Sequence, residues 1–429
     1  MMHIFSMKGK TKGTKIQHIC DAPLLYIPLQ NYSNCIFEPQ VKVGEAVKKY
    51  QLIGKTIYGF YTCIHSPISG VVQDIRESLQ SDGSLLPTII IKNDFQETEA
   101  ELFPSKDYLQ YTSDELLNII ENSGIVGEGG AQFPTASKYK PDGKKINTFI
   151  VNGTECEPYL TADYALMAER TEELFKGISI VNKILEAEDI AISIEEQNKE
   201  LQDIFAPLLK KSEYSKFRVA VLSNNYPQGS ELQLIKSITG IELPRNRRPR
   251  EAGVIVSNVG TIHAIYQAVV NNKPVISRII TVSGEKAVNY GNFEIKIGTP
   301  VGHVINTLGL PISNNTLIIG GPMMGKQVTD WNISVTKGTA GILLLEKENV
   351  KRNNCISCGY CVEACPMKLM PMKFEEYYRK GKYLSLERFS ISSCIECAAC
   401  EYICPSNVPL IESIKEGKNK LKQLTDAIK

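Results

Sequence analysis

The sequence lacks any apolar stretch near the roughly 20 residues that cross a bilayer, and runs such as GILLLE at 341–346 are of strand length. It also lacks an excess of either charge, since 48 Lys and Arg stand against 47 Asp and Glu. This balance excludes a global field directed at nucleic acid or an acidic membrane. The single dense basic run, RNRRPR at 245–250, is typical of a solvated loop. We therefore expect no nucleic-acid partner, and membrane association through partner subunits only.

Cysteine is concentrated near the end of the sequence. In NNCISCGYCVEACPMKL, intervals of two, two and three residues separate four cysteines and a proline follows the last; SSCIECAACEYICPSNV repeats this pattern. Eight of the 12 cysteines therefore obey one rule. A C-x2-C-x2-C run wraps three thiolates around one face of an iron–sulfur cubane, and in two-cluster ferredoxins the fourth cysteine ligates the other cluster.

The spacing thus predicts two [4Fe-4S] clusters with crossed ligation. One is assigned to Cys355, Cys358, Cys361 and Cys404, and the other to Cys394, Cys397, Cys400 and Cys365. Structural zinc usually takes two paired C-x2-C elements, and disulfide frameworks suit small secreted domains. The first 30 residues show no secretory signal. We expect a cytoplasmic protein, free or peripheral on the cytoplasmic face of the membrane, in an anaerobic setting.

The region 27–75 consists of short β-rich runs broken by Gly and Pro. Its phrases VKVGEAVKKYQLIG and HSPISGVV resemble the two halves of a lipoyl or biotinyl domain, the barrel-sandwich hybrid. Lys55 lies at the edge of the connection without a Met-Lys-Met-like tip, so we expect no swinging arm. Cys63, with Cys20 and Cys35, stays unassigned. Two interpretations of Cys63 are open, a reactive thiol and, favoured here, a buried small hydrophobe.

A glycine-rich loop, GIVGEGGAQFPTASKY, follows a helix expected to end near Gly124. A Rossmann fingerprint needs a strand before its glycines, and a Walker loop needs Gly-Lys-Ser or Gly-Lys-Thr, so neither fits. Gly127, Gly129 and Gly130 can let the backbone approach a phosphate or a flat ring closely, because they carry no Cβ. Lys138 is near enough in sequence to reach a bound phosphate.

Polar residues follow the ends of several predicted strands. INTFIVN ends near Asn152, with Glu155 and Glu157 just beyond it. Such carboxylates suit hydrogen bonds to ribose hydroxyls or an amide in an open α/β crevice, and equally suit a solvated loop or a helix N-cap. FRVAVLSNNYPQG and EAGVIVSNVGT predict two buried parallel strands that end in turns.

Taken together, GEGGAQFPT, NGTECEPYLTAD, YPQGSELQLI, SNVGT, GGPMMG and the cysteine runs resemble the RnfC family. RnfC is the NADH-binding, iron–sulfur subunit of the Rnf electron-transport complex and is similar to the flavin-bearing NADH-binding subunit of respiratory complex I. The resemblance runs from about Ile27 to Pro409. It implies a bound FMN and NAD(H) as substrate beside the two clusters.

The resemblance also implies roles for particular residues. A flavin-phosphate loop would comprise Gly127, Gly129, Gly130 and Lys138, with Phe133 stacking on the nicotinamide. Asn152 would contact the FMN, and Glu155 and Glu157 would stand near flavin and nicotinamide. The dinucleotide side would be lined by Tyr226, Gly229 and Glu231, and the ribityl-phosphate end held by Asn258 and Thr261. We expect no catalytic acid or base, because hydride transfer requires none.

Two positions depart from the family pattern. The family's loop usually reads Gly-Gly-Ala-Gly-Phe-Pro, and Gln132 replaces its last glycine here; Glu128 adds a negative charge beside the loop. These changes leave room for a soluble relative such as PrdC, the electron-transfer protein associated with proline reductase. They also leave open a flavin-free iron–sulfur relay or scaffold fed by another flavoprotein. Thiol redox chemistry at Cys63 is a third alternative.

The expected fold is multidomain, combining α/β and α+β parts. We predict a β barrel-sandwich hybrid at 1–100, an α/β flavin domain like the NADH-binding part of complex I at 101–272, an SLBB-like β-grasp domain at 273–347, and a helical two-cluster ferredoxin-like module at 348–429. The expected function is electron transfer between NAD(H), FMN, two clusters and a partner. That partner would be the Rnf membrane complex, a ferredoxin or a soluble reductase.

Overall fold

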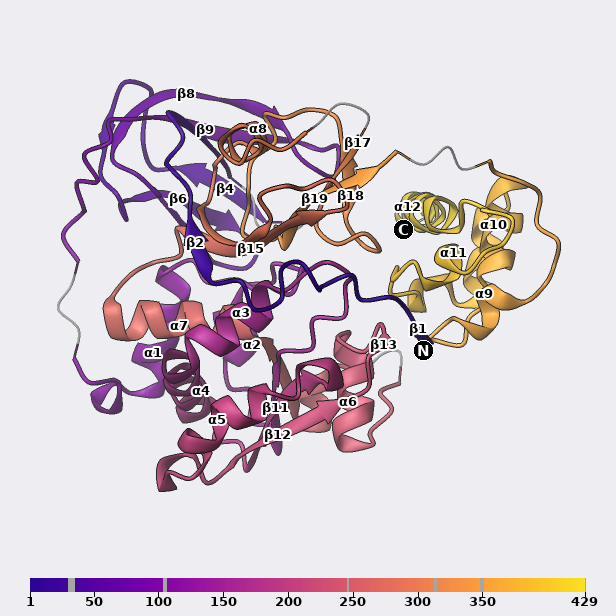
Figure 1. The fold of residues 1–429 in the computed structure, drawn as a ribbon, viewed down its shortest axis with the longest axis horizontal. Helices are drawn as coiled ribbons and strands as arrows, with labels where there is room; N and C mark the ends of the chain where they lie inside the picture. Colours follow the sequence, from indigo (N-terminus) through magenta and orange to yellow (C-terminus); the bar gives the residue numbers. More distant parts are fainter. Residues whose placement is uncertain (30–34, 103–105, 245–246, 312–314, 348–350, 429) are drawn as a thin grey trace.

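The computed structural model describes residues 1–29, 35–102, 106–244, 247–311, 315–347 and 351–428. Figure 1 shows an α/β domain, two β-rich domains above it and a helical module at one side. The four parts match the predicted fold class. Within the described ranges, none of the helices has the length and apolar character needed to traverse a bilayer.

The first β-rich domain is built from two antiparallel sheets. One has the strand order β3 (Leu24–Pro28), β9 (Leu85–Asn93), β8 (Gly70–Leu79) and β5 (Ala46–Val47). The other has the order β4 (Ile36–Pro39), β6 (Leu52–Tyr58) and β7 (Cys63–His65). Aliphatic side chains of both sheets share one core. Cys63 is 2% exposed and burial raises the pKa of its thiol, so its position suits packing better than redox chemistry.

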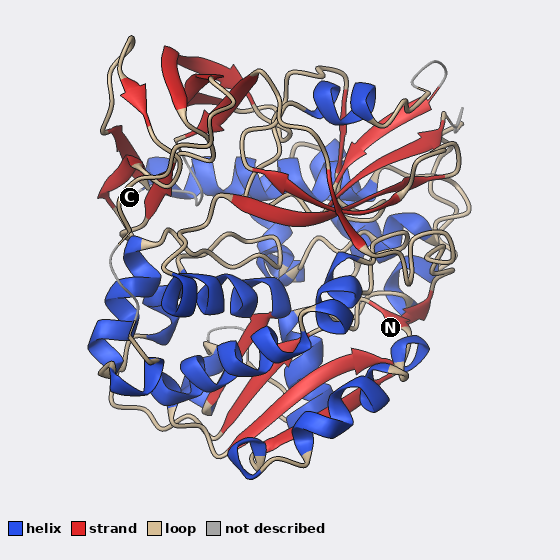
Figure 2. Cartoon of the chain, turned by 60° about the vertical axis from the view of Figure 1, so that its left-hand side comes forward, coloured by secondary structure: helices blue, strands red, loops and turns tan. Residues whose placement is uncertain are grey.

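The α/β domain contains a parallel sheet of order β12-β11-β10-β14. Its strands are β10 (Thr148–Asn152), β11 (Asp189–Glu195), β12 (Phe217–Leu222) and β14 (Val254–Asn258). One sheet face packs on α1 (Ser113–Asn122), α4 (Thr171–Leu185), α5 (Leu201–Leu209) and α7 (Val259–Asn271). The other packs on α6 (Glu231–Thr239), and Figure 2 shows helices lying along the strands. Both faces are covered, which explains why consecutive residues of β10 and β14 are apolar on both faces.

The β-grasp domain is a six-stranded sheet of order β18-β17-β19-β15-β16-β2. Its strands are β15 (Ser277–Gly284), β16 (Gly291–Lys296), β17 (Asn315–Ile319), β18 (Lys326–Val328) and β19 (Gly341–Glu346). The short helix α8 (Val301–Thr307) packs on this sheet through aliphatic side chains. The order of strand, turn, strand and short helix agrees with the prediction. The edge strand β2 (Ile16–His18) comes from the start of the chain and was not predicted.

The first 20 residues thread between the other domains, as the indigo ribbon in Figure 1 shows. β1 (Met2–His3) pairs antiparallel with β13 (Asn225–Tyr226) of the α/β domain. Lys8 is 4% exposed; its Nζ donates to the carbonyl oxygen of Glu155 and lies 3.3 Å from Glu195 Oε2. Burial opposes the charged form of Lys8, but the neighbouring carboxylates raise its pKa overall. This segment therefore joins several domains.

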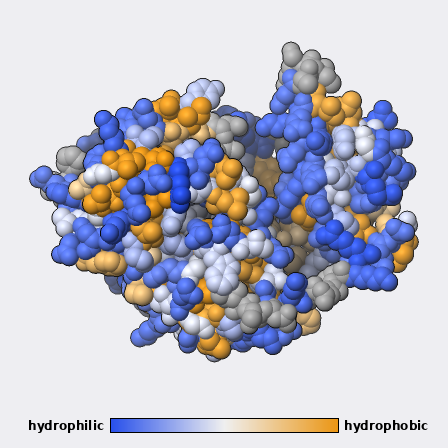
Figure 3. Space-filling view, turned by 90° about the horizontal axis from the view of Figure 1, so that it is seen from above, coloured by the Kyte–Doolittle hydropathy of each residue, from blue (hydrophilic) through white to orange (hydrophobic). Residues whose placement is uncertain are grey.

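The C-terminal module contains α9 (Tyr360–Glu363), α10 (Pro371–Arg379), α11 (Ala399–Tyr402) and α12 (Leu410–Ile428). The two cysteine runs repeat each other in backbone conformation: Gly359 and Ala398 have φ of 85° and 62°, and Ser357 and Glu396 both have φ of 56°. The cysteine run is therefore duplicated in structure as well as in sequence. Figure 3 shows the module as a lobe that a groove separates from the rest of the molecule.

Candidate functional site

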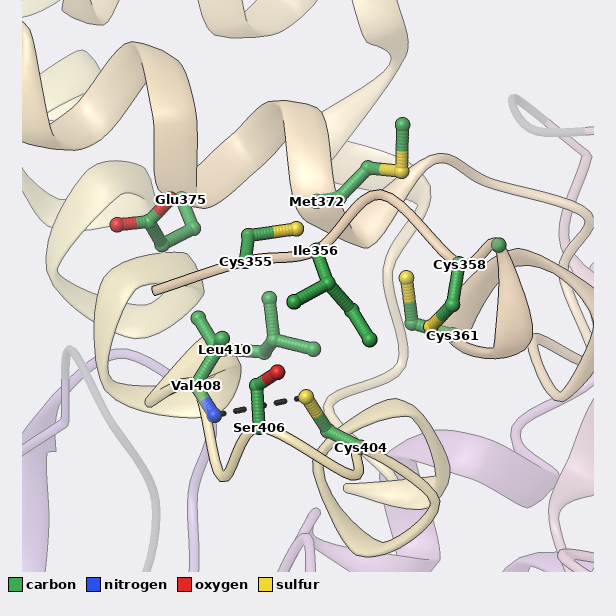
Figure 4. A pocket seen from close by; sticks show the side chains of 11 residues that line it. Cys355, Ile356, Cys358, Cys361, Met372, Glu375, Cys404, Ser406, Val408 and Leu410 are labelled. Carbon is green, nitrogen blue, oxygen red and sulfur yellow. Dashed lines mark hydrogen bonds between the residues drawn. The ribbon is translucent and has the colours of Figure 1, made fainter. Parts of the chain in front are cut away.

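The eight cysteines of the two runs sort into two cavities. The first is lined by Cys355, Cys358, Cys361 and Cys404. In Figure 4, Cys404 reaches this space from the loop below it, whereas Cys355 lies above the space and Cys358 and Cys361 lie beside it. The second cavity is lined by Cys365, Cys394, Cys397 and Cys400. Each cavity therefore draws three cysteines from one run and the fourth from the other run.

Backbone N–H groups face the sulfurs of both cavities. The amide of Ser357 lies 3.4 Å from Cys355 Sγ, and the amide of Val408 lies 3.5 Å from Cys404 Sγ. In the second cavity, Glu396 N lies 3.4 Å from Cys394 Sγ. Donors directed at sulfur stabilise thiolates, the form that ligates iron. No group of three or more His, Cys, Asp or Glu in the described residues is arranged to hold a single metal ion, whereas four thiols around one space fit a cluster.

The two cavities differ in their access to solvent. Cys355 and Cys358 of the first set are exposed, whereas Cys397 and Cys400 of the second set are each 7% exposed. Burial raises the pKa of Cys397 to about 11 and also raises the pKa of Cys400. A bound metal centre would deprotonate these thiols, because coordination favours the thiolate.

A second group of predicted residues meets at the carboxyl end of the parallel sheet. Asn152 and Asn258 are paired in register as the last residues of β10 and β14. Asn152 donates through Nδ2 to the carbonyl of Gly229 at 3.0 Å. A Cβ on Gly229 would lie 2.2 Å from the carbonyl oxygen of Thr154, so only glycine fits there. This edge is where open α/β sheets bind ligands.

The glycine-rich loop lies over this edge. Its backbone is held by the Thr261 hydroxyl, which accepts from the amide of Glu128 at 2.9 Å. A Cβ built on Gly130 would meet no atom within 4 Å, and one on Gly129 would lie 3.7 Å from Asn258 Cβ. The loop therefore presents bare backbone to open space, as a phosphate or ring would require. This geometry fits the flavin phosphate that the sequence predicted there.

Cationic and aromatic groups stand next to the loop. Lys138, on α2 (Thr135–Tyr139), forms an ion pair of 2.9 Å with Glu231 at the start of α6. Phe133 makes an edge-to-face contact with Phe60 of the barrel-sandwich domain, with ring centroids 5.0 Å apart. The structure therefore places Lys138, Glu231 and Phe133 beside the loop, and the resemblance had implied that all of them lie at one ligand site.

The two departures from the family pattern both leave the open side of the loop clear. Gln132 has φ of 51°, a conformation that glycine adopts more easily. Its side chain turns toward Gly338, where a Cβ would lie 2.4 Å from Gln132 Nε2. Glu128 turns inward against Gly260 and lines an interdomain cleft with Arg278. Burial raises the pKa of Glu128. Neither side chain blocks a ligand over Gly129 and Gly130.

The two glutamates after β10 have different surroundings. Glu155 is half-buried; its Oε1 accepts from the amide of Asp163 at 3.3 Å, and its buried Oε2 has no hydrogen-bond partner in the described structure. Burial, followed by the nearby Asp163, raises the Glu155 pKa to about 8. Glu157 instead accepts from the amides of Met323 at 3.0 Å and Met324 at 2.9 Å. Burial raises the Glu157 pKa to about 7.

In the structure Glu157 and Tyr226 make contacts within the protein that the resemblance did not imply. Each oxygen of Glu157 accepts one backbone amide of the turn at 321–325, so this carboxylate holds the turn in place. Tyr226 is 2% exposed and donates through its hydroxyl to the carbonyl of Cys397 at 2.8 Å. β1 pairs with β13 and the cysteine module packs on it, so the Tyr226 ring is not available to a dinucleotide in this conformation.

Several residues at the site had no signal in the sequence. Asp163 accepts from Asn258 Nδ2 at 2.7 Å, and Arg278 donates to the carbonyl of Glu128 at 2.6 Å. Lys8 reaches the Glu155 backbone from the first residues of the chain. All three act across long sequence separations, where local pattern carries no information.

Three protein-family models match separate parts of the chain. The RnfC barrel sandwich hybrid domain matches residues 2–96, the Nuo51 FMN-binding domain matches residues 120–267, and the 4Fe-4S dicluster domain matches residues 354–408. These matches confirm the prediction that the cofactors are FMN and [4Fe-4S] clusters.

Whole-chain relatives are similar over nearly the full sequence. The C subunit of an ion-translocating oxidoreductase complex from Rhodobacter capsulatus is 34% identical, covering 98% of this chain and 82% of the relative. The C subunit of a proton-translocating ferredoxin:NAD(+) oxidoreductase complex from Clostridium ljungdahlii is 37% identical, covering 84% of this chain and 79% of the relative. The corresponding Haemophilus influenzae protein is 34% identical over 99% of this chain. The chain spans about half to two thirds of the length of the H. influenzae relatives, from 52% to 66%.

Among solved structures, a chain of an NAD+-reducing [NiFe]-hydrogenase in the H2-reduced state is similar in fold. The two share 19% identity with a TM-score of 0.53, covering 74% of this chain and 64% of that chain. At this identity the likeness concerns the fold alone.

Proposed function

The chain belongs to the RnfC family, whose members are the C subunits of ion-translocating oxidoreductase complexes. We therefore propose that it transfers electrons between NAD(H), a bound FMN, two [4Fe-4S] clusters and a partner. One observation carries the proposal: eight cysteines lie around two cavities in crossed sets, in a module that packs directly on the α/β domain. The proposed partner is the remainder of a membrane complex, of the same kind as the ion-translocating complexes to which its relatives belong. A ferredoxin and a soluble reductase are the alternative partners. The chain would then sit peripherally on the cytoplasmic face of the membrane.

The cluster ligands are proposed as the two cavity sets, so that Cys404 completes the first cluster and Cys365 the second. The amides of Ser357 and Glu396 would donate to ligating sulfurs. Such donors tune a cluster's reduction potential.

The FMN is proposed to lie over the glycine-rich loop at the carboxyl edge of the sheet. Gly129 and Gly130 would admit its phosphate end, and Lys138 would supply the positive charge. Asn152 and Asn258 offer side-chain amides at the ends of neighbouring strands. When bound, FMN supplies the exchange between two-electron hydride chemistry and one-electron transfer.

Nicotinamide binding is assigned to the same edge. Phe133 offers an aromatic face beside the loop, and Glu231 lies within ion-pair distance of Lys138. The Oε2 of Glu155 has no partner among the described residues, and the pKa of this carboxyl group is raised to about 8. It would gain a hydrogen bond from a ligand with a polar group at that point. None of these residues needs to move a proton for hydride transfer.

A flavin-free relay is the competing function. It would require the loop to be closed to FMN, yet Gln132 and Glu128 turn their side chains away from its open side. The orientation of these two side chains therefore favours a flavoprotein.

The test is an anaerobic absorbance spectrum of the cluster-reconstituted protein before and after NADH, with flavin assayed after acid release. We expect flavin, bleached by NADH, with loss of cluster absorbance. Full clusters without flavin or any NADH response would refute the proposal in favour of the relay. Lys138→Ala should weaken FMN binding by about tenfold, the value of a charge-assisted hydrogen bond. Lys144→Ala is the control, since Lys144 is a surface lysine paired with Asp142 and Glu251.

A further inference from the structure

We infer that Tyr226 is a positioning residue for the second cysteine set, because its hydroxyl fixes the peptide that follows the ligand Cys397. The inference rests on the proposed function, since it concerns one of the two clusters that this function requires. It gives Tyr226 a role different from dinucleotide binding.

The contact between Tyr226 and Cys397 is direct and shielded from water. The hydroxyl donates to the Cys397 carbonyl at 2.8 Å across 171 residues of sequence. Tyr226 is 2% and Cys397 7% exposed. Ile4, from the segment that follows β1, packs in the same apolar cluster as Tyr226, Cys397 and Ala399. A hydrogen bond sealed in this way is not readily replaced by one to water.

The backbone beside Cys397 needs such support, whereas its counterpart in the first run does not. Ala398, the next residue, has φ of 62°, a left-handed conformation that is unfavourable for a residue with a Cβ. At the equivalent place after Cys358 stands Gly359, with φ of 85°, where glycine carries no such cost. Among the described residues, no side chain donates to the Cys358 carbonyl.

This hydrogen bond links the α/β domain to the second cysteine set. The donor lies on β13 of the α/β domain, and the acceptor lies in the loop that wraps the second cavity. Hydrogen bonding and solvent access around a cluster set its reduction potential. Loss of the hydroxyl should therefore change the second cluster and spare the first.

The experiment compares Tyr226→Phe with the wild-type holoprotein in an anaerobic dithionite titration followed by EPR. We expect the reduced-to-oxidised ratio of one cluster, at a fixed ambient potential, to change by about two- to tenfold, the effect of one hydrogen bond. The other cluster should titrate as in the wild type. Tyr402→Phe is the control, because Tyr402 lies in the same module with 51% exposure.

Ala398→Gly supplies the second arm. In that background Tyr226→Phe should change the ratio by less than about twofold, because glycine holds the turn without help. Unchanged titration of both clusters in Tyr226→Phe, or equal shifts of both, would overturn the inference. Loss of both clusters that Ala398→Gly fails to restore would overturn it as well. Wild-type protein that loads no clusters would instead refute the proposed function, and neither readout depends on NADH.

Discussion

Crossed ligation can be tested by removing cysteines in pairs. Cys355 and Cys404 line one cavity although they belong to different runs. If they serve one cluster, the Cys355→Ala/Cys404→Ala variant loses that cluster and keeps the other intact. Iron should fall from about eight to about four atoms per chain, since each [4Fe-4S] cluster contributes four. The surviving cluster should be the one whose buried ligands include Cys397.

The matched variant is Cys355→Ala/Cys365→Ala, which removes the first and last cysteines of one run. Because these two thiols line different cavities, this change should damage both clusters and leave no normal [4Fe-4S] signal. Iron content and EPR of the reduced proteins measure both variants. If ligation were not crossed, the two results would be exchanged. An intact cluster in Cys355→Ala/Cys365→Ala, with none in Cys355→Ala/Cys404→Ala, would therefore refute the assignment.

Three further outcomes are expected. In Glu157→Gln the free energy of unfolding should depend less on pH between about 4.5 and 7. The folded-state pKa of Glu157 is raised to about 7, so its contribution to stability is present below the unfolded-state pKa and is lost as pH rises, by at most about 3 kcal/mol. A profile of Tm against pH that matches the wild type would count against this. Gln132→Gly should keep FMN affinity within about twofold, since the Gln132 side chain faces Gly338; a large gain in bound flavin would show that Gln132 obstructs the site. Lys337→Met should lower the free energy of unfolding by about 1–3 kcal/mol and therefore lower Tm, because Lys337 Nζ donates to the buried carbonyls of Cys63 and Gly124 at 3.1 and 2.7 Å. The control, Lys48→Met at an exposed lysine, should have no effect on Tm.

Local sequence pattern was enough to predict the features that repeat or alternate. The cysteine spacing predicted both sets, because a short run fixes the relative positions of its own thiols. The apolar runs before Asn152 and Asn258 predicted two strands, and parallel pairing then placed their ends together. The fold class came from these elements together with the resemblance to the RnfC family.

The features that sequence did not predict depend on contacts between distant segments. β1 has two residues, too few for any periodicity, yet it covers Tyr226. The two amides that Glu157 binds lie 166 and 167 residues away, and Glu128 turns toward a cleft formed by several domains. The motif predicted the approximate location of each of these residues, whereas the orientation of each side chain depends on tertiary packing.

The position of the first residues has a consequence for synthesis on the ribosome. Ile4 packs with Tyr226 and with Cys397 and Ala399, so its final environment requires a chain completed to nearly residue 400. At about 5–20 residues per second, that delay is roughly 20 to 80 seconds after Ile4 is made. The partners of Lys8 and of β1 in the α/β domain are made earlier, so during this interval Ile4 lacks only the contacts that the cysteine module supplies. The seam between the α/β domain and the second cysteine set can therefore close only after almost the whole chain has been translated.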